Sequence, residues 1–195
     1  MNITSELVKK LREQTGAGMM DCKKFLAAAK GDYDKAVEML RKEGQKIATK
    51  KAGRAAANGL IESYIHPGNR VGVLIEVNCE TDFVARNTEF KELVHDLAMH
   101  IEDFDPPYKD VQDVSAEIIE KEKEIYREQL KKEKKPEAIM NKIIDGKLAK
   151  YYEEVCLMKQ KFLKDDKKTV EQYLIEKIAK IGENIQIKRY IRYSL

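Results

Sequence analysis

The order of hydrophobic and polar positions divides the chain at about residue 58. Up to residue 44, apolar side chains recur three or four positions apart in three groups, and a glycine follows each group. Residues spaced in this way share one face of a helix, and glycine commonly ends a helix. The pattern therefore predicts three short helices that pack as a small bundle. Their inward positions are Leu7, Val8, Leu11, Cys22, Phe25, Leu26, Ala29, Tyr33, Val37 and Leu40.

Beyond residue 58, short runs of β-branched and aliphatic residues replace the helical spacing. Residues 60–66 and 71–77 predict two strands, and the Pro-Gly-Asn sequence between them is typical of a tight turn. Apolar residues within 185–193 predict a third strand, which would complete an antiparallel sheet with this hairpin. Helices that begin near Thr88 and Thr169 supply apolar faces to pack with the sheet. The fold class predicted is α+β.

Between these segments lie two long, highly charged stretches with a narrow apolar stripe, residues 115–135 and 138–152, separated by Pro136. They predict an antiparallel helical hairpin that projects from the core. A narrow stripe on such a pair usually meets a partner helix, although a solvated arm with no partner would show the same pattern.

Residues 45–58 are basic and show no clear apolar face. We interpret them as a linker, helical in part; a tail that binds nucleic acid is the alternative, but few cations without interleaved aromatics favour it only weakly. The predicted domains are a three-helix bundle at 1–44, a linker at 45–58, and a core at 59–195 into which the hairpin at about 115–152 is inserted.

Composition limits the classes of protein. Of 195 residues, 36% are charged and 43% hydrophobic, and no apolar run is long enough to be a membrane span or a signal peptide, which predicts a cytoplasmic protein without membrane contact. Three widely spaced cysteines favour neither a disulfide framework nor a zinc site. The net charge of +3 is unevenly placed, because residues 1–58 are basic and the rest is slightly acidic. This asymmetry favours a partner with an acidic patch as much as nucleic acid.

The sequence NCETDFVAR at 78–86 ends the second predicted strand with a polar turn that carries one large aromatic residue. A strand that presents Asp82 and Phe83 at its end has the form of a probe, an apolar wedge beside a carboxylate. Two other interpretations stay open at this point: Phe83 could fold back into its own core, and Asp82 could cap a helix.

Adjacent methionines at 19 and 20 raise a similar question. Two neighbours on a helix cannot both face one core, and flexible thioethers suit an adaptable docking surface. The alternative is that one of them is buried and the other is an ordinary surface residue.

Three motifs together resemble elongation factor Ts, the guanine-nucleotide exchange factor for elongation factor Tu of bacteria and organelles. They are TGAGMMDCKK at 15–24, NCETDFVAR at 78–86 and KIGENIQIKR at 180–189, so the resemblance covers essentially the whole chain. It implies that the first three helices form a ubiquitin-associated-like bundle that binds the GTPase domain of elongation factor Tu. The contacts implied there are Lys9, Arg12, Met19 and Met20.

The resemblance also implies how such a protein acts. The segment of Thr81, Asp82, Phe83 and Val84 would enter the GTPase domain beside its Mg²⁺ site, displace the ion and so release GDP, with Phe83 as the wedge. The predicted helical hairpin corresponds to a projection that the family associates with dimerisation.

A second contact is implied at the turn that carries His66 and Gly68. Longer members of the family have two half-cores, each with a version of this hairpin, whereas this chain has one and resembles the short form. We therefore expect a homodimer within a 2:2 complex, in which Phe83 of one chain and His66 of the other reach the same partner molecule.

No catalytic constellation, phosphate-binding glycine loop or metal-ligand cluster is visible, so we predict no enzyme activity, no cofactor, no metal and no direct contact with nucleic acid. The main rival is a non-enzymatic scaffold that binds the ribosome or nucleic acid. A hydrolase that uses Asp82 or His66 is a more distant rival, because no nucleophile with a nearby base accompanies them.

Overall fold

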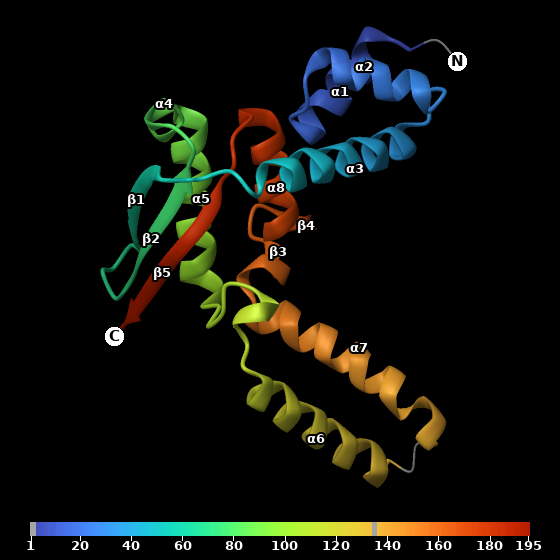
Figure 1. The fold of residues 1–195 in the computed structure, drawn as a ribbon, viewed down its shortest axis with the longest axis vertical. Helices are drawn as coiled ribbons and strands as arrows, with labels where there is room; N and C mark the ends of the chain where they lie inside the picture. Colours follow the sequence, from blue (N-terminus) through green and yellow to red (C-terminus); the bar gives the residue numbers. More distant parts are fainter. Residues whose placement is uncertain (1–2, 134–135) are drawn as a thin grey trace. The chain divides into compact units, whose positions relative to one another are not determined.

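The computed structural model describes residues 3–133 and 136–195, which form two compact units (Figure 1). One unit comprises the chain up to Ala98 together with Gln172–Leu195, and the other is Met99–Glu171. The predicted α+β class is confirmed, because helices accompany a three-stranded antiparallel sheet. The predicted division at residues 44 and 58 stays a prediction.

The first unit begins with α1 (Ser5–Thr15), α2 (Met19–Ala28) and α3 (Tyr33–Lys51). The side chains of Thr4 and Asp32 cap α1 and α3 by accepting backbone N–H groups, and Gly16 ends α1 in the left-handed conformation with φ 66°. These residues explain why three helices form within so short a stretch. The small core of the bundle consists of Val8, Leu11, Cys22, Leu26, Ala29, Ala36 and Val37.

The helix end predicted at Gly44 is wrong, because α3 continues to Lys51 and includes much of the expected linker. Gly44 is buried on α3, and a Cβ at this position would lie 3.6 Å from Ile175 and 3.8 Å from the Cβ of Ala179. Both of those residues belong to α8 (Val170–Ile181). Both distances are those of ordinary van der Waals contact, so Gly44 lies beside α8 within a continuous helix and does not end α3.

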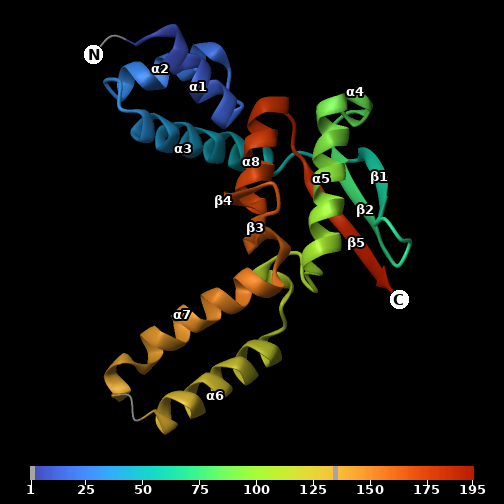
Figure 2. The same cartoon turned by 180° about the vertical axis from the view of Figure 1, so that it is seen from behind.

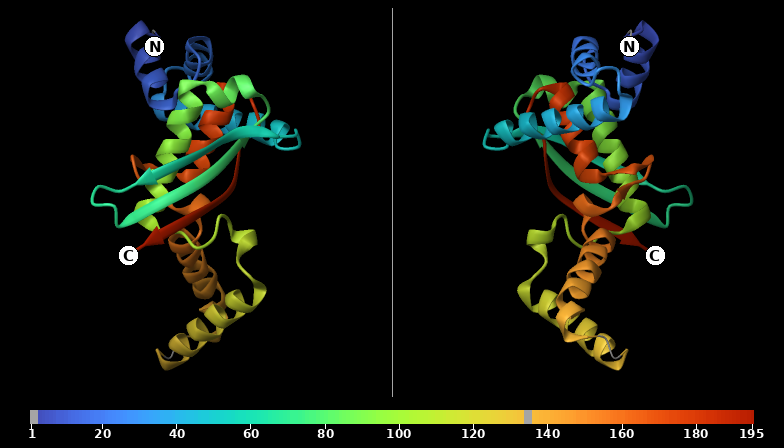
Figure 3. Two further views of the ribbon diagram at one scale, coloured as in Figure 1. Left: turned by 90° about the vertical axis from the view of Figure 1, so that its left-hand side faces the viewer. Right: turned by 90° about the vertical axis from the view of Figure 1, so that its right-hand side faces the viewer.

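The sheet consists of β1 (Asn58–Ile65), β2 (Val71–Cys79) and β5 (Gln186–Ser194), with β2 in the centre and both pairings antiparallel. This confirms the predicted hairpin and third strand. Helices α5 (Thr88–Phe104) and α8 lie on one side of the sheet (Figures 2 and 3). Val73, Ile75 and Val77 are buried on β2.

The other side of the sheet carries a row of exposed apolar residues, which we call the open face: Ile61, Ile65, Leu74, Ile191 and Tyr193. The strand register makes them neighbours, since Leu74 pairs with Ile191 and Gly72 lies between Ile65 and Tyr193. Glu76 and Arg189 pair on the same side, with Arg189 Nε 2.7 Å from the Glu76 carboxylate.

The second unit contains α6 (Ala116–Lys132) and α7 (Glu137–Val155), which pack on each other and confirm the predicted helical hairpin. Leu130, Ile144 and Leu148 are the buried residues between them. Two short 3-10 helices, η1 (Val111–Asp113) and η2 (Leu157–Lys159), flank the pair. Strands β3 (Lys161–Phe162) and β4 (Asp165–Thr169) form a small hairpin that the polar sequence there did not predict.

Within residues 3–133 and 136–195, no helix combines the length and apolar character that crossing a bilayer requires. All three cysteines are free and buried.

Candidate functional site

The polar turn after β2 forms a short helix, α4 (Asp82–Arg86), which we call the tip. The side chain of Phe83 is 82% exposed there, whereas Phe90 in the following helix is fully buried. The interpretation that Phe83 folds back into its own core is therefore wrong, and of these two phenylalanines it is Phe90 that belongs to the core.

Asp82 does not cap the tip helix, which excludes the other simple interpretation. The cap is Thr81, whose hydroxyl accepts the N–H of Val84 at 3.4 Å. The Asp82 carboxylate lies 3.0 Å from the guanidinium of Arg86, and both side chains are largely exposed. An exposed pair of this kind contributes little, so the carboxylate is accessible to another molecule.

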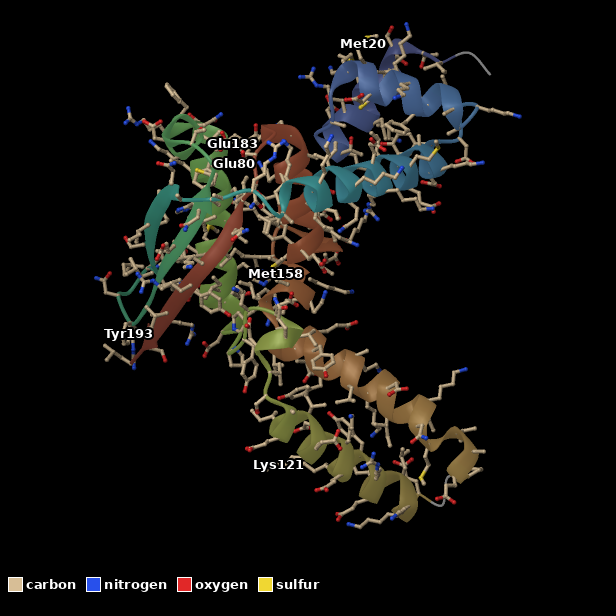
Figure 4. The ribbon with its side chains drawn as sticks, viewed as in Figure 1. Met20, Glu80, Lys121, Met158, Glu183 and Tyr193 are labelled. Carbon is tan, nitrogen blue, oxygen red and sulfur yellow. The ribbon has the colours of Figure 1, made fainter. Side chains whose placement is uncertain are left out.

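The carboxylate of Glu183, in the turn between α8 and β5, holds the start of the tip. One of its oxygens accepts the backbone N–H groups of Glu80 and Thr81, each at 3.0 Å, and the other accepts the Thr81 hydroxyl at 2.6 Å. Figure 4 shows Glu80 and Glu183 side by side at this end of the sheet. Three hydrogen bonds to one charged acceptor fix the backbone from which the tip begins.

Glu80 makes the reciprocal contact. Its carboxylate accepts the backbone N–H of Asn184 at 2.6 Å and lies 3.4 Å from the Arg54 guanidinium. The hydrogen bond from Asn184, followed by the charge of Arg54, holds the pKa of Glu80 below its usual range. We call the four residues Glu80, Thr81, Glu183 and Asn184 the clamp.

Cys79, the last residue of β2, directly precedes Glu80 of the clamp and is fully buried. Burial, with the nearby Glu183 carboxylate as the next cause, raises the pKa of this thiol to about 11. Its sulfur lies 3.1 Å from the Thr81 carbonyl oxygen, to which the S–H donates. Cys79 is therefore a protonated packing residue.

His66 and Gly68 lie in the exposed turn at the opposite end of β2. The turn is closed by the His66 N–H, which donates to Val71 at 2.9 Å, and by the Asn69 N–H, which donates to His66 at 2.9 Å. Because β2 spans nine residues, this turn and the tip are separated by roughly 25 Å of extended strand. Within one chain they cannot meet at one point.

The third predicted group lies on the bundle. Met19 is 47% and Met20 75% exposed, so the interpretation that one of them is a core residue is wrong. Cys22 and Leu26 occupy the inward positions of α2 instead. Lys9 and Arg12, one turn apart on α1, are also exposed.

Sequence reasoning did not find the clamp. Glu80 and Glu183 are 103 positions apart in their shared hydrogen bond, so no local spacing connects them. The only local signal was the polar pair Glu183-Asn184 between two apolar runs, directly after Gly182, and it does not specify a partner.

A sheet that ends in an exposed ring beside an exposed carboxylate is an arrangement typical of protein-binding surfaces. In the described part of the chain, no group of three histidine, cysteine or acidic side chains could hold a metal ion.

The family described as elongation factor TS matches residues 2–195, and the chain belongs to this family. Three relatives named elongation factor Ts show the extent of the similarity. The protein of Desulforamulus reducens is 54% identical over 99% of this chain and 89% of its own length. That of Pseudothermotoga lettingae is 55% identical over 98% and 97%, and that of Syntrophus aciditrophicus 54% over 100% and 97%.

Proposed function

We propose that this chain is a guanine-nucleotide exchange factor that releases GDP from elongation factor Tu. The segment Thr81–Val84 enters the GTPase domain of the partner beside its Mg²⁺ site, and Phe83 acts as the wedge with Asp82 beside it. The observation that carries the proposal is the 82% exposure of Phe83 on a tip fixed by the clamp. Family membership supports the partner and the type of activity.

The chemistry of Mg²⁺ explains why a small displacement is sufficient. The ion requires near-ideal octahedral geometry, so shifting the groups that hold its waters and phosphates lowers its affinity. Once Mg²⁺ is displaced, GDP dissociates faster. Because coupling between ligands is reciprocal, nucleotide weakens the binding of this chain as much as this chain weakens the binding of nucleotide.

Burial of Phe83 alone cannot supply the free energy that a large acceleration of GDP release requires. Burying one phenylalanine contributes roughly 1.5–3 kcal/mol, or about one to two decades in an equilibrium constant. Additional binding energy must come from docking elsewhere. The exposed methionines of α2, together with Lys9 and Arg12, supply such a surface on the bundle.

Stopped-flow release of a fluorescent GDP analogue from elongation factor Tu tests the wedge. We expect Phe83→Ala and Asp82→Ala to dock at concentrations similar to wild type but to release GDP more slowly, by about 10- to 100-fold for Phe83→Ala. Leu163→Ala removes another exposed apolar side chain and serves as the control. Release at the wild-type rate by both tip variants would reject the proposal.

The homodimer is part of the same proposal. The tip and the His66 turn lie at opposite ends of β2, and we propose that the tip of one copy and the His66 turn of a second copy reach the same partner molecule. We propose that the open face pairs with the open face of that copy. Pairing would cover its apolar residues, and the ion pair of Glu76 with Arg189 would lower the cost of burying these two charges.

A further inference from the structure

We propose that Glu183 is a positioning residue, and that the clamp joins the tip to helix α3. Docking of the bundle on the partner then determines the position and orientation of Phe83. This inference rests on the proposed function, whose residues act on the partner. Glu183 acts only through Thr81 and the backbone of the tip.

First, the backbone N–H groups at the start of the tip have no partner in the sheet and bind Glu183 instead. Strand pairing ends at Cys79 on the β1 side and at Asn78 on the β5 side. The next two N–H groups, those of Glu80 and Thr81, therefore lie beyond the ladder, and both donate to Glu183. The carboxylate thus extends the fixed backbone of the sheet by two residues, up to the start of the helix that carries Phe83.

The second step concerns the Thr81 hydroxyl, which is used in two directions. It donates to Glu183 at 2.6 Å and accepts the Val84 N–H at 3.4 Å. One hydroxyl therefore both binds the Glu183 carboxylate and caps the first turn of α4. A helix of only five residues has too few internal hydrogen bonds to hold its own direction, so this anchoring decides where Phe83 points.

The third step connects the clamp to α3. The side-chain amide of Asn184 donates to the carbonyl oxygens of Arg54 at 2.7 Å and Ala52 at 3.4 Å. Lys51, the last residue of α3, donates to the carbonyl oxygen of Gly182. Asn184 is buried, so these bonds are shielded from water. The segment that holds the tip is therefore also bonded to the end of the bundle's longest helix.

This arrangement has a function beyond stability. If the bundle docks first, its position reaches the tip through α3, the turn 182–184 and the clamp, which hydrogen bonds connect one to the next. A tip that is already ordered loses no further conformational freedom when it enters the partner. Without the clamp the bundle would still bind, but Phe83 would meet the Mg²⁺ site in many orientations.

Glu183→Ala and Glu183→Gln separate this role from general stability. Alanine removes all three bonds. Glutamine conserves them, because its oxygen accepts both N–H groups and its amide donates to the Thr81 oxygen. Glu153→Ala, which removes an exposed carboxylate from α7, is the control.

Amide hydrogen exchange of the free chain is the first measurement. We expect Glu183→Ala to accelerate exchange at Glu80 and Thr81 while the central residues of β2 stay protected, and we expect Glu183→Gln and Glu153→Ala to resemble wild type. Unchanged protection at Glu80 and Thr81 would overturn the proposal.

Release of GDP from elongation factor Tu is the second measurement. We expect Glu183→Ala to lower the maximal release rate by roughly 10- to 100-fold, the effect of a misplacement of about 1 Å, while the half-saturating concentration stays near that of wild type. Glutamine should restore the rate.

Three further results would contradict the positioning role of Glu183, each for a different reason. Wild-type release by Glu183→Ala overturns the positioning role alone. A parallel loss of rate, docking and thermal stability shows a merely structural role and also overturns it. Failure of the wild-type chain itself to accelerate release overturns the proposed function, and with it the positioning role.

Discussion

At the scale of single residues, the most constrained side chain outside the site is His100 of α5. It is fully buried and stacked on Phe104, with ring centroids 4.6 Å apart. Its Nδ1 accepts the backbone N–H of Leu163 at 3.2 Å, so Nε2 carries the proton and donates to Gln160 at 3.0 Å. Burial lowers the pKa of His100 and outweighs the opposing effects of Gln160 and Asp103.

This pKa predicts a pH dependence of stability. In the unfolded chain His100 takes up a proton near its ordinary pKa of about 6.5, but in the folded chain only at lower pH, so acid favours unfolding. Stability should be complete above that pH and fall below it, by at most about 1.4 kcal/mol per pH unit. Urea denaturation at pH 5.5 and 7.5 measures this.

His100→Gln is the comparison, because glutamine does not titrate in this range. We expect the difference in unfolding free energy between the two pH values to be smaller in this variant than in wild type. Equal differences in both proteins would show that His100 does not cause the effect.

Some residue positions could be predicted from the sequence and others could not. Two adjacent methionines cannot share one core, so exposure of at least one was implied by helix geometry alone. The exposure of Phe83 was not, because the residue pattern alone does not distinguish it from Phe90, which lies seven positions later and is fully buried. The pairing of Glu80 with the Glu183 turn depends on β5 lying beside β2, and the predicted third strand did not specify which strand would be its neighbour.

At the scale of elements, a glycine that follows an apolar group can either end a helix or lie inside one, and only the structure distinguishes the two cases. Gly16 ends α1 with a positive φ, as its position after an apolar group predicted. Gly44 occupies the same kind of position but lies inside α3, which continues to Lys51. Helix existence followed from periodicity, whereas this boundary did not, because a helix tolerates an interior glycine at a modest cost.

Two other glycines give a matched test. Gly146 lies inside α7 with nothing within 4 Å of an added Cβ, so Gly146→Ala should stabilise by about 0.5–1 kcal/mol through helix propensity. Gly59 in β1 has φ 149°, and an added Cβ would lie 2.2 Å from the Val77 carbonyl oxygen. Gly59→Ala should destabilise by at least about 1–3 kcal/mol.

Thermal and urea denaturation measure both changes. An increase in stability for Gly59→Ala would show that β1 can move away from β2 at this point. A loss for Gly146→Ala would indicate that α7 has a neighbour at this surface.

At the scale of the whole molecule, the proposed pairing of two open faces predicts the oligomeric state. Light scattering at micromolar concentration should give twice the mass of one chain. Leu74→Lys and Ile191→Lys place charges in the centre of the open face and should produce monomers that keep their fold, because both side chains are exposed in the single chain.

Ile125→Lys is the matched variant, since it adds the same charge at an exposed isoleucine of α6. Dissociation by Ile125→Lys alone would assign dimerisation to the helical hairpin instead of the open face. A wild-type chain that is monomeric at these concentrations and fully active in nucleotide exchange would exclude the dimer.

The pairing of β2 with β5 has a consequence for synthesis of the protein. A ribosome makes the residues of the tip long before Glu183, which follows Glu80 by 103 positions. Synthesis proceeds at about 5–20 residues per second, so roughly 5–20 s pass between Glu80 and Glu183. During this time β2 has no β5 partner on one edge, and the tip has no contact with Glu183. In a growing polypeptide the tip therefore lacks its contacts with Glu183 until the last turn and strand have been made.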